Sequence, residues 1–275
     1  MSPVEAIVLG IVQGLTEFLP ISSTAHLIIV PALLGWPDAG TAYNAVIQLG
    51  SVVAVIAYFF RDLAKILIGS ITALKEKNFA NQDLRILGAI LFGTLPICVV
   101  GLLLKPMLEQ DNSPLRSFMV VGVASIFMGL LLLLAEKVAT HRRGLDSIGA
   151  RDGLLVGLGQ TMALIPGCSR SGSTLTVAML LNMKREEAAR FSFLLGIPAI
   201  VLSGLLELKK LVHSGMDQSA STNLIIGLVV SLVVSYISIA WLLKYLQKHS
   251  TLVFVVYRII FGSTAIFLAS RSMSH

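Results

Sequence analysis

Two short polar segments carry most of the chemistry that this sequence offers. The first runs from Gln13 to His26 and reads QGLTEFLPISSTAH. Gln13 and Glu17 are four residues apart, so a helix would place both side chains on one face. Their oxygens suit a hard divalent cation such as Mg²⁺ or Ca²⁺, with substrate phosphate and water completing the shell. We therefore predict Glu17 and Gln13 as metal ligands.

The rest of this first segment offers a nucleophile and a base. A proline ends one helical arm, and Ser22 or Ser23 can cap a second. The free N–H groups at a helix start, where Thr24 would lie, attract anions. His26 follows Ser23 by three residues, which places it within reach as a base for the serine hydroxyl. We predict Ser23, His26 and Glu17 as catalytic residues, while simple capping would also account for the serines.

The second segment reads PGCSRSGST and is suited to bind phosphate. Its two glycines allow a sharp turn and a close approach to a ligand. The guanidinium of Arg170 is always charged and can contact two phosphate oxygens at once. An ion pair of Arg170 with Glu17 alone is the alternative, and both contacts can coexist. The predicted phosphate-binding residues are Arg170, Ser169, Ser171, Gly172, Thr174 and, from the first segment, Thr24.

The composition indicates that these segments lie in a membrane protein. Of 275 residues, 55% are hydrophobic and only 13% are charged, with a mean hydropathy of +0.85. A soluble domain usually carries about 25% charged residues. The net charge of +6 is scattered over short loops rather than gathered on one face, so we predict no nucleic-acid partner.

The elements that must position the polar segments can be read from the apolar runs. Two stretches, residues 4–35 and 153–182, are apolar but interrupted by the polar segments, and their arms are too short to span. We predict that each is a re-entrant helical hairpin, buried in protein or lining a wet cavity. Six other runs are long enough to cross a bilayer, namely residues 42–60, 86–104, 117–135, 191–208, 223–243 and 252–269.

The two interrupted stretches resemble each other. Gln13 aligns with Gln160, and after a slip of one residue Pro20 aligns with Pro166 and Ser23 with Ser169. We predict a single transmembrane domain, residues 1–275, with repeat one at about 1–136 and repeat two at about 151–275. Because each half has one hairpin and three spans, the second half enters the membrane inverted. Such inverted-topology repeats place ligand sites at their interface near the midplane.

The distribution of positive charge tests this topology. Fourteen Lys and Arg residues fall in loops 61–85, 136–152, 183–190 and 244–250, and five fall on the other face. The positive-inside rule makes the first face cytoplasmic and puts both termini outside. Only Arg170 and Arg258 lie within the membrane. Arg258 either snorkels or pairs with an acid, or else reaches the polar site.

The polar motifs resemble those of a known family. Gln13–His26 and Pro166–Gly172 are similar to the two signature motifs of the undecaprenyl-pyrophosphate phosphatase family, the bacitracin-resistance type. Ile47–Gly50, Phe191–Leu195 and the Tyr257-Arg258 pair also look like that family. The resemblance therefore covers nearly the whole chain.

The resemblance implies an activity and a set of site residues. The family removes the terminal phosphate from C55 undecaprenyl pyrophosphate, recycling the lipid carrier for peptidoglycan and other wall polymers in the bacterial plasma membrane. It needs a divalent cation. Its (Glu/Gln)-xxx-Glu motif falls on Gln13 and Glu17, its serine on Ser23, its histidine on His26 and its arginine on Arg170. Glutamine at the first position weakens Gln13 as a ligand.

We therefore expect an all-α integral membrane phosphoric anhydride hydrolase. Either Ser23 attacks the terminal phosphorus with His26 as base, or Ser23 positions a water that His26 activates. The alternative function is a transporter or flippase of a phosphorylated polyprenyl lipid, because inverted repeats and broken helices are typical of transporters. Membrane lipids are expected partners, and a homodimer is left open.

Overall fold

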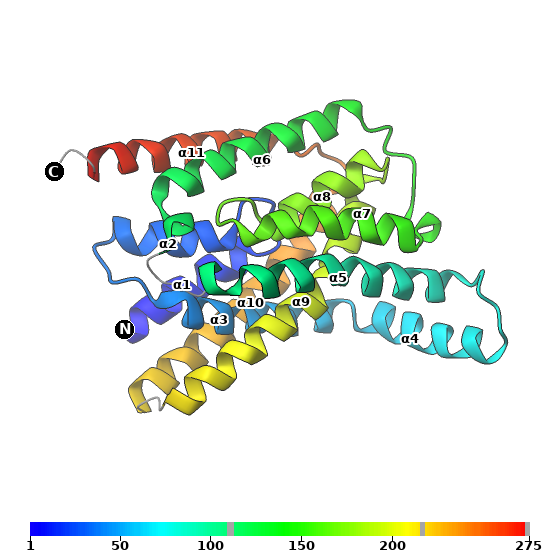
Figure 1. Cartoon of the computed structure of the whole chain (residues 1–275), viewed down its shortest axis with the longest axis horizontal. Coiled ribbons are helices and arrows are strands. Elements are labelled where there is room, and N and C mark those ends of the chain that lie inside the picture. Colours follow the sequence, from blue (N-terminus) through cyan, green and yellow to red (C-terminus); the bar gives the residue numbers. More distant parts are fainter. Residues whose placement is uncertain (109–112, 215–217, 273–275) are drawn as a thin grey trace.

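The computed structural model describes residues 1–108, 113–214 and 218–272, and these ranges fold into α-helices with three short 3₁₀-helices. Figure 1 shows the helices lying side by side, most of them along the long axis of the molecule. The α-helices are α1 (Pro3–Thr16), α2 (Ser23–Leu33), α3 (Gly40–Tyr58), α4 (Phe60–Lys75), α5 (Gln82–Leu108), α6 (Phe118–Val138), α7 (Ala150–Gln160), α8 (Arg170–Leu180), α9 (Arg185–Ser214), α10 (Gln218–Leu246) and α11 (Leu252–Ser272). The 3₁₀-helices are η1 (Pro114–Arg116), η2 (Leu145–Ser147) and η3 (Thr161–Leu164).

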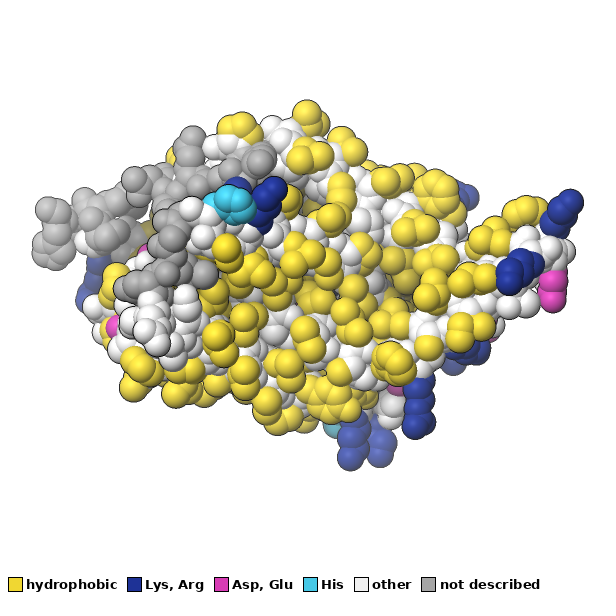
Figure 2. Space-filling model, turned by 90° about the horizontal axis from the view of Figure 1, so that it is seen from below, with side chains coloured by type: hydrophobic (Ala, Val, Ile, Leu, Met, Phe, Trp, Pro, Cys, Tyr) yellow, Lys and Arg dark blue, Asp and Glu magenta, His cyan; other side chains and the backbone are white. Residues whose placement is uncertain are grey.

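Six of these helices are long and apolar enough to cross a membrane, which confirms the six predicted spans. They are α3, α5, α6, α9, α10 and α11, and each overlaps one predicted run. Large apolar side chains remain exposed along them, and Figure 2 shows a broad hydrophobic surface over the middle of the molecule. An exposed apolar surface of this extent requires lipid around it. The chain is a multi-pass membrane protein.

The two interrupted stretches form pairs of short helices, as predicted. Helices α1 and α2 have 14 and 11 residues, and α7 and α8 have 11 residues each. At 1.5 Å per residue these arms are only about 16 to 21 Å long. Each is shorter than the roughly 30 Å hydrocarbon core.

Helix α4 lies in a segment, residues 61–85, that the sequence analysis assigned to a loop. Its buried residues Ile66, Ser70 and Ala73 recur at helical spacing and face the bundle. Charged residues on the same helix shorten its apolar run below the length of a span, so hydropathy did not reveal it. Together with the first turns of α5, it projects from one end of the molecule (Figure 1).

The short helices pack across the chain, and each first arm lies against a helix of the opposite half. Helix α1 packs against α10, and α7 packs against α5, while α6 lies on α11 and α3 on α9. Glycine allows these close crossings: a Cβ on Gly157 would lie 2.1 Å from the Gly93 carbonyl oxygen, and one on Gly10 would lie 2.8 Å from the Gly227 carbonyl oxygen. Each half therefore packs against the short first arm of the other half, and these contacts hold the two halves together around their polar turns.

The ends of the molecule differ in what they carry. The start of α1 and the end of α11 lie at one end, on the left in Figure 1, while the α4–α5 and α6–α7 connections lie at the other. Ion pairs tie down that second end, among them Arg190–Asp62, Arg185–Glu136 and Arg143–Asp152. The basic loops 61–85 and 136–152 therefore share one end, as the charge count predicted.

Candidate functional site

The polar turns of both hairpins have the same unusual backbone. Ser22 is the N-cap of α2 with φ 78°, and Ser169 is the N-cap of α8 with φ 69°. Each serine hydroxyl accepts a hydrogen bond from an N–H three residues ahead, Ala25 and Gly172 respectively. A positive φ is uncommon for serine and costs energy, so tertiary contacts must hold both turns. As N-caps of the second arms, Ser22 and Ser169 are the corresponding residues of the two turns. The sequence alignment, which included a slip of one residue, had instead paired Ser23 with Ser169.

The tips of the two hairpins touch each other. The Gly167 N–H donates to the Ser22 hydroxyl at 3.3 Å, and the Ser171 hydroxyl donates to the Leu19 carbonyl at 3.0 Å. These contacts join segments more than 140 residues apart in the chain. The two motifs that were predicted to form one site therefore meet in the structure.

Glu17 is the centre of the buried hydrogen bonds at this junction. Its Oε1 accepts from Nη2 of Arg170 at 3.1 Å, and its Oε2 accepts from the Ser23 hydroxyl at 2.6 Å. Gln13 Nε2 donates to the same Oε2 at 2.9 Å. The side chains of Arg170 and Glu17 are only 9% and 5% exposed. In such a poorly solvated place these charge-assisted hydrogen bonds are strong and hold their geometry.

Arg170 is placed by its neighbours on α9. Its Nη1 donates to the Ser192 carbonyl at 3.1 Å, and its Nε is buried without a partner among the described residues. A Cβ on Gly196 would lie 1.8 Å from Nη1, so only glycine leaves room for the guanidinium there. An unpaired buried donor is unusual, and an anionic ligand would satisfy this Nε–H.

The hydrogen bonds of His26 go to residues other than Ser23. Its Nδ1 lies 2.7 Å from the Ser22 carbonyl, which can only accept, so Nδ1 carries the proton. Nε2 therefore accepts from the Tyr257 hydroxyl at 2.6 Å, and the ring stacks on Phe261 at 4.2 Å. Within the described part of the chain no hydrogen bond joins His26 to Ser23. The three-residue spacing predicted that His26 lies within reach of Ser23, but both ring nitrogens are bonded elsewhere, Nε2 to Tyr257 on α11.

The hydroxyls predicted to bind phosphate mostly hold the turns. Ser169 and Ser171 hydroxyls lie 3.1 Å apart, and the Thr174 hydroxyl donates to the Arg170 carbonyl at 2.8 Å. The Gly172 N–H is already bonded to the N-cap serine, while Thr24 is half-buried in the first turn of α2. All of these residues lie at the two tips, within or beside the cluster around Glu17.

Arg258 joins the two tips, a role that the sequence analysis left open. It is 1% exposed, so it does not snorkel, and among the described residues it makes no ion pair. Its Nη1 donates to the Pro20 carbonyl at 2.8 Å, and its Nη2 donates to the Gly167 and Cys168 carbonyls at 2.6 and 3.2 Å. In the sequence Arg258 stood out as an arginine inside an apolar run and as part of the Tyr257-Arg258 pair that resembles the family.

Replacing Arg258 with Met should uncouple the tips. The change leaves carbonyls on both turns without donors, at about 1–3 kcal/mol for each buried group. We expect a clear fall in Tm in detergent and a loss of turnover of roughly a hundredfold or more. Arg258→Lys should have a higher Tm and a higher turnover than Arg258→Met, but both should stay below those of the parent protein, because an ammonium cannot reach all of the carbonyls. Arg271→Met, at the exposed end of α11, is the control, and normal Tm and turnover in Arg258→Met would exclude this role.

Glu17 and Gln13 can serve a cation only together with other ligands. The described residues hold no cluster of three or more His, Cys, Asp or Glu side chains. The Gln13 amide lies beside the Glu17 carboxylate, and its Oε1 is buried without a partner. Turning the amide by half a revolution would bring this oxygen to the carboxylate, so both could bind one ion. The pair fits a cation such as Mg²⁺, which takes its remaining ligands from phosphate and water.

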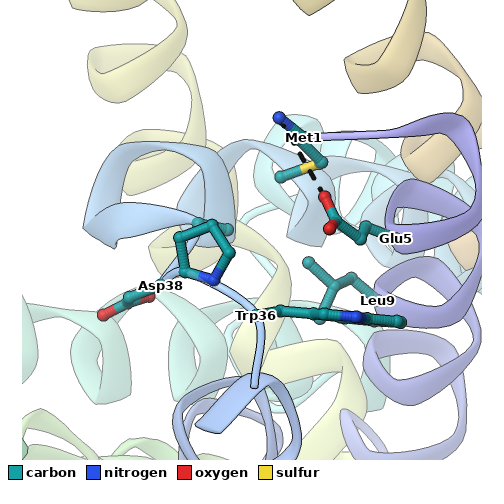
Figure 3. A pocket seen from close by; sticks show the side chains of 7 residues that line it. Met1, Glu5, Leu9, Trp36 and Asp38 are labelled. Atoms are coloured by element: carbon teal, nitrogen blue, oxygen red, sulfur yellow. Dashed lines mark ion pairs between the residues drawn. The ribbon is translucent and has the colours of Figure 1, made fainter. Parts of the chain in front are cut away.

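A cavity of about 170 Å³ lies elsewhere, between the start of α1 and the loop before α3 (Figure 3). Glu5 and Trp36 line it, and the amino terminus lies 4.0 Å from the Glu5 carboxylate. Asp38 at its edge is paired with Arg116. None of its lining residues belongs to the cluster around Glu17, so it is no part of the candidate site.

Comparison with known proteins identifies the family. The family model described as bacitracin resistance protein BacA matches residues 6–264. A protein of Gloeobacter violaceus named undecaprenyl-diphosphatase is 54% identical over 98% of this chain and 92% of its own length. Relatives of the same name from Synechococcus elongatus and Trichormus variabilis are 54% and 51% identical, over 94% and 95% of this chain and 90% and 82% of their own. The chain belongs to the BacA family of bacitracin resistance proteins.

Proposed function

We propose that this protein is a membrane phosphatase that hydrolyses undecaprenyl pyrophosphate to undecaprenyl phosphate and inorganic phosphate. Its relatives carry the name undecaprenyl-diphosphatase over nearly the whole chain. The observation that carries the proposal is the buried Glu17, which accepts from both Ser23 and Arg170. Hydroxyl, carboxylate and guanidinium are the groups that phosphoryl transfer needs. The product would return to the bacterial plasma membrane as the lipid carrier for cell-wall synthesis.

In this proposal Ser23 attacks the terminal phosphorus of the diphosphate. Its proton passes to Glu17, with which it is already hydrogen-bonded at 2.6 Å. The bond from that phosphorus to the bridging oxygen breaks, and undecaprenyl phosphate leaves. Arg170 binds the negative oxygens of the transferred group through its fork. Water then releases phosphate from the serine, and the proton returns from Glu17 to Ser23.

A second route uses the same residues without a covalent intermediate. Ser23 positions a water molecule and His26 takes one of its protons as the water oxygen bonds to the terminal phosphorus. The bond from that phosphorus to the bridging oxygen breaks, and undecaprenyl phosphate and inorganic phosphate leave. In this route His26 must first leave the Tyr257 hydroxyl, since its Nε2 is occupied there. The remaining residues, Ser169, Ser171, Gly172, Thr174 and Thr24, shape the phosphate-binding turns in either route.

The proposal includes a divalent cation, Mg²⁺ or Ca²⁺, held by Glu17 and Gln13. When bound, it would neutralise charge that develops on the diphosphate. Removing it with a chelator should lower phosphate release roughly tenfold or more, and added Mg²⁺ or Ca²⁺ should restore it. Glu17→Gln should not be restored by either ion. Full turnover of thoroughly chelated protein would remove the cation from the proposal.

We also propose that the architecture is an inverted-topology repeat forming one transmembrane domain, with halves at about 1–136 and 151–275. The reciprocal packing of α1 on α10 and α7 on α5 supports it, as do the matching N-caps of α2 and α8. Both hairpins are then re-entrant, with their tips near the midplane. The substrate would slide in from the surrounding lipid.

The proposed orientation places both termini outside the cytoplasm. With Cys98 and Cys168 replaced, a membrane-impermeant maleimide should label Ser2→Cys in intact cells. Lys77→Cys, in the basic connection after α4, should be labelled only after the cells are permeabilised. The reverse labelling pattern would show that the orientation is opposite to the one proposed, and it would leave the proposed reaction unchanged.

Purified protein in detergent provides the test of function. Phosphate release from undecaprenyl pyrophosphate, lost in Glu17→Gln, is the expected result. Detergent abolishes sidedness, so a transporter or flippase of phosphorylated lipid would release no phosphate under these conditions. Binding of the lipid without hydrolysis would replace the phosphatase by that alternative.

A further inference from the structure

An apolar groove lies between α2 and α11, next to the polar tips. It has a volume of about 230 Å³ and is lined by side chains that include Ile29, Leu33, Tyr257, Ile260 and Thr264. Two of its lining residues, Ile29 and Ala265, belong to a buried cluster that joins α2, α6 and α11. Packed side chains of these three helices therefore form the floor of the groove.

The periodicity of both helices aligns the groove with the site. On α2, His26, Ile29 and Leu33 are three and four residues apart and share one face. On α11, Tyr257 and Thr264 are seven residues apart, two turns along one face. Both helices run toward the same end of the molecule, on the left in Figure 1. The groove thus leads from the His26–Tyr257 pair outward over about 10 Å.

The inner end of the groove is polar and the rest is apolar. The Tyr257 hydroxyl is bonded to His26, whose Nδ1 is bonded to the carbonyl of Ser22, the N-cap beside Ser23. Farther out, Ile260 and Leu33 form rims that are 62% and 59% exposed, and Ile29 is buried at the base. A ligand that fills this groove must carry its polar end at the tips and an apolar chain away from them.

We infer that this groove binds the isoprene units next to the diphosphate of a polyprenyl substrate. The inference rests on the proposed function and adds where the chain leaves the site. The terminal phosphate lies among Ser23, Glu17 and Arg170, and the chain passes Tyr257 into the groove. Beyond Leu33 and Thr264 the chain enters the bilayer. The groove recognises the start of the prenyl chain, whatever the total chain length.

This position explains the contacts of Tyr257. Its ring is 41% exposed and lines the groove, while its hydroxyl holds the ring of His26. A chain lying on the tyrosine ring would stabilise that hydrogen bond by excluding water from it. Ordinary lipid covers the remaining apolar surface, whereas this hollow begins at Tyr257, whose hydroxyl is bonded to His26.

Thr264→Phe tests the inference by filling the outer part of the groove. Thr264 is exposed, and its hydroxyl bonds only to the Ile260 carbonyl of its own helix, so the larger ring can be accommodated in the fold. For farnesyl and undecaprenyl diphosphates we expect KM to rise roughly tenfold with kcat nearly unchanged. Isopentenyl diphosphate, which has one isoprene unit, should show no change. Val229→Phe, on the exposed face of α10, is the matched control.

A photoreactive prenyl diphosphate gives a readout that does not depend on turnover. With the reactive group on the second isoprene unit, labelling should map to 257–265 or 26–33, and unlabelled undecaprenyl diphosphate should compete. Labels spread over α10 and not competed would overturn the inference. So would equal KM values in Thr264→Phe, Val229→Phe and the parent protein. If the parent releases no phosphate from any diphosphate, the proposed function itself is wrong, which separates the two failures.

Discussion

Ser23→Ala is expected to reduce phosphate release from undecaprenyl pyrophosphate by roughly ten-thousandfold or more, because removing a nucleophile costs at least this much in comparable enzymes. Ser23 lies 2.6 Å from the Glu17 carboxylate, so its hydroxyl is already paired with the group that would accept its proton. Alanine removes the attacking oxygen and leaves the tips in place. Single-turnover phosphate release by purified protein is the measurement.

The two routes make different predictions for His26. If Ser23 attacks directly, acid quenching should trap phosphate on a peptide that contains Ser23, and His26→Ala should lose far less activity than Ser23→Ala. If His26 activates water, no phosphoserine forms and both variants lose activity to a similar degree. Ser203→Ala is the control, because that hydroxyl bonds only to the Ile200 carbonyl of its own helix. Turnover of Ser23→Ala close to the parent level would contradict both routes.

Arg170→Lys is expected to lower kcat/KM by roughly a hundredfold to a thousandfold, although the charge is kept. One guanidinium reaches Glu17 through Nη2 and the Ser192 carbonyl through Nη1, and its Nε remains free for phosphate. A lysine ammonium is a point charge and cannot make these contacts at once. The loss should appear mainly in kcat, because the fork matters most when charge develops on the transferred group.

Arg190→Lys is the matched control for this change. Arg190 pairs with Asp62 at 3.1 Å near the α4 end of the molecule, away from the tips. We expect its turnover to stay within about twofold of the parent, as for a partly exposed ion pair. Undiminished phosphate release by Arg170→Lys would remove Arg170 from the mechanism.

Much of the architecture could be predicted because the bilayer restricts what a chain can do. A span must be apolar over its whole length, so six runs of Leu, Val and Ile were sufficient to locate α3, α5, α6, α9, α10 and α11. The short hairpin arms followed from the same length rule together with proline, glycine and serine at their turns. Helix α4 was not predicted because it is amphipathic, and its apolar face is too short to be a span.

Part of the site was also predicted. Glu17, Ser23 and Arg170 were selected because ionisable and hydroxyl groups are costly inside a membrane, and the structure brings all three together. The contact of His26 with Tyr257 was not predicted, and of the alternatives left open for Arg258 the structure supports the one in which it reaches the polar site. Both depend on α11, which follows the first hairpin by more than 200 residues.

The sequence by itself determined which segments cross the membrane, which turns carry polar groups and which family the motifs resemble, since each depends on residues close together in the chain. The tertiary structure alone decided that Ser23 pairs with Glu17, that His26 turns to Tyr257 and that Arg258 joins the two tips. The physical reason is that spacing along a helix defines a shared face but not the direction of a side chain. That direction depends on which helix packs against the face, and here it is one distant in the sequence.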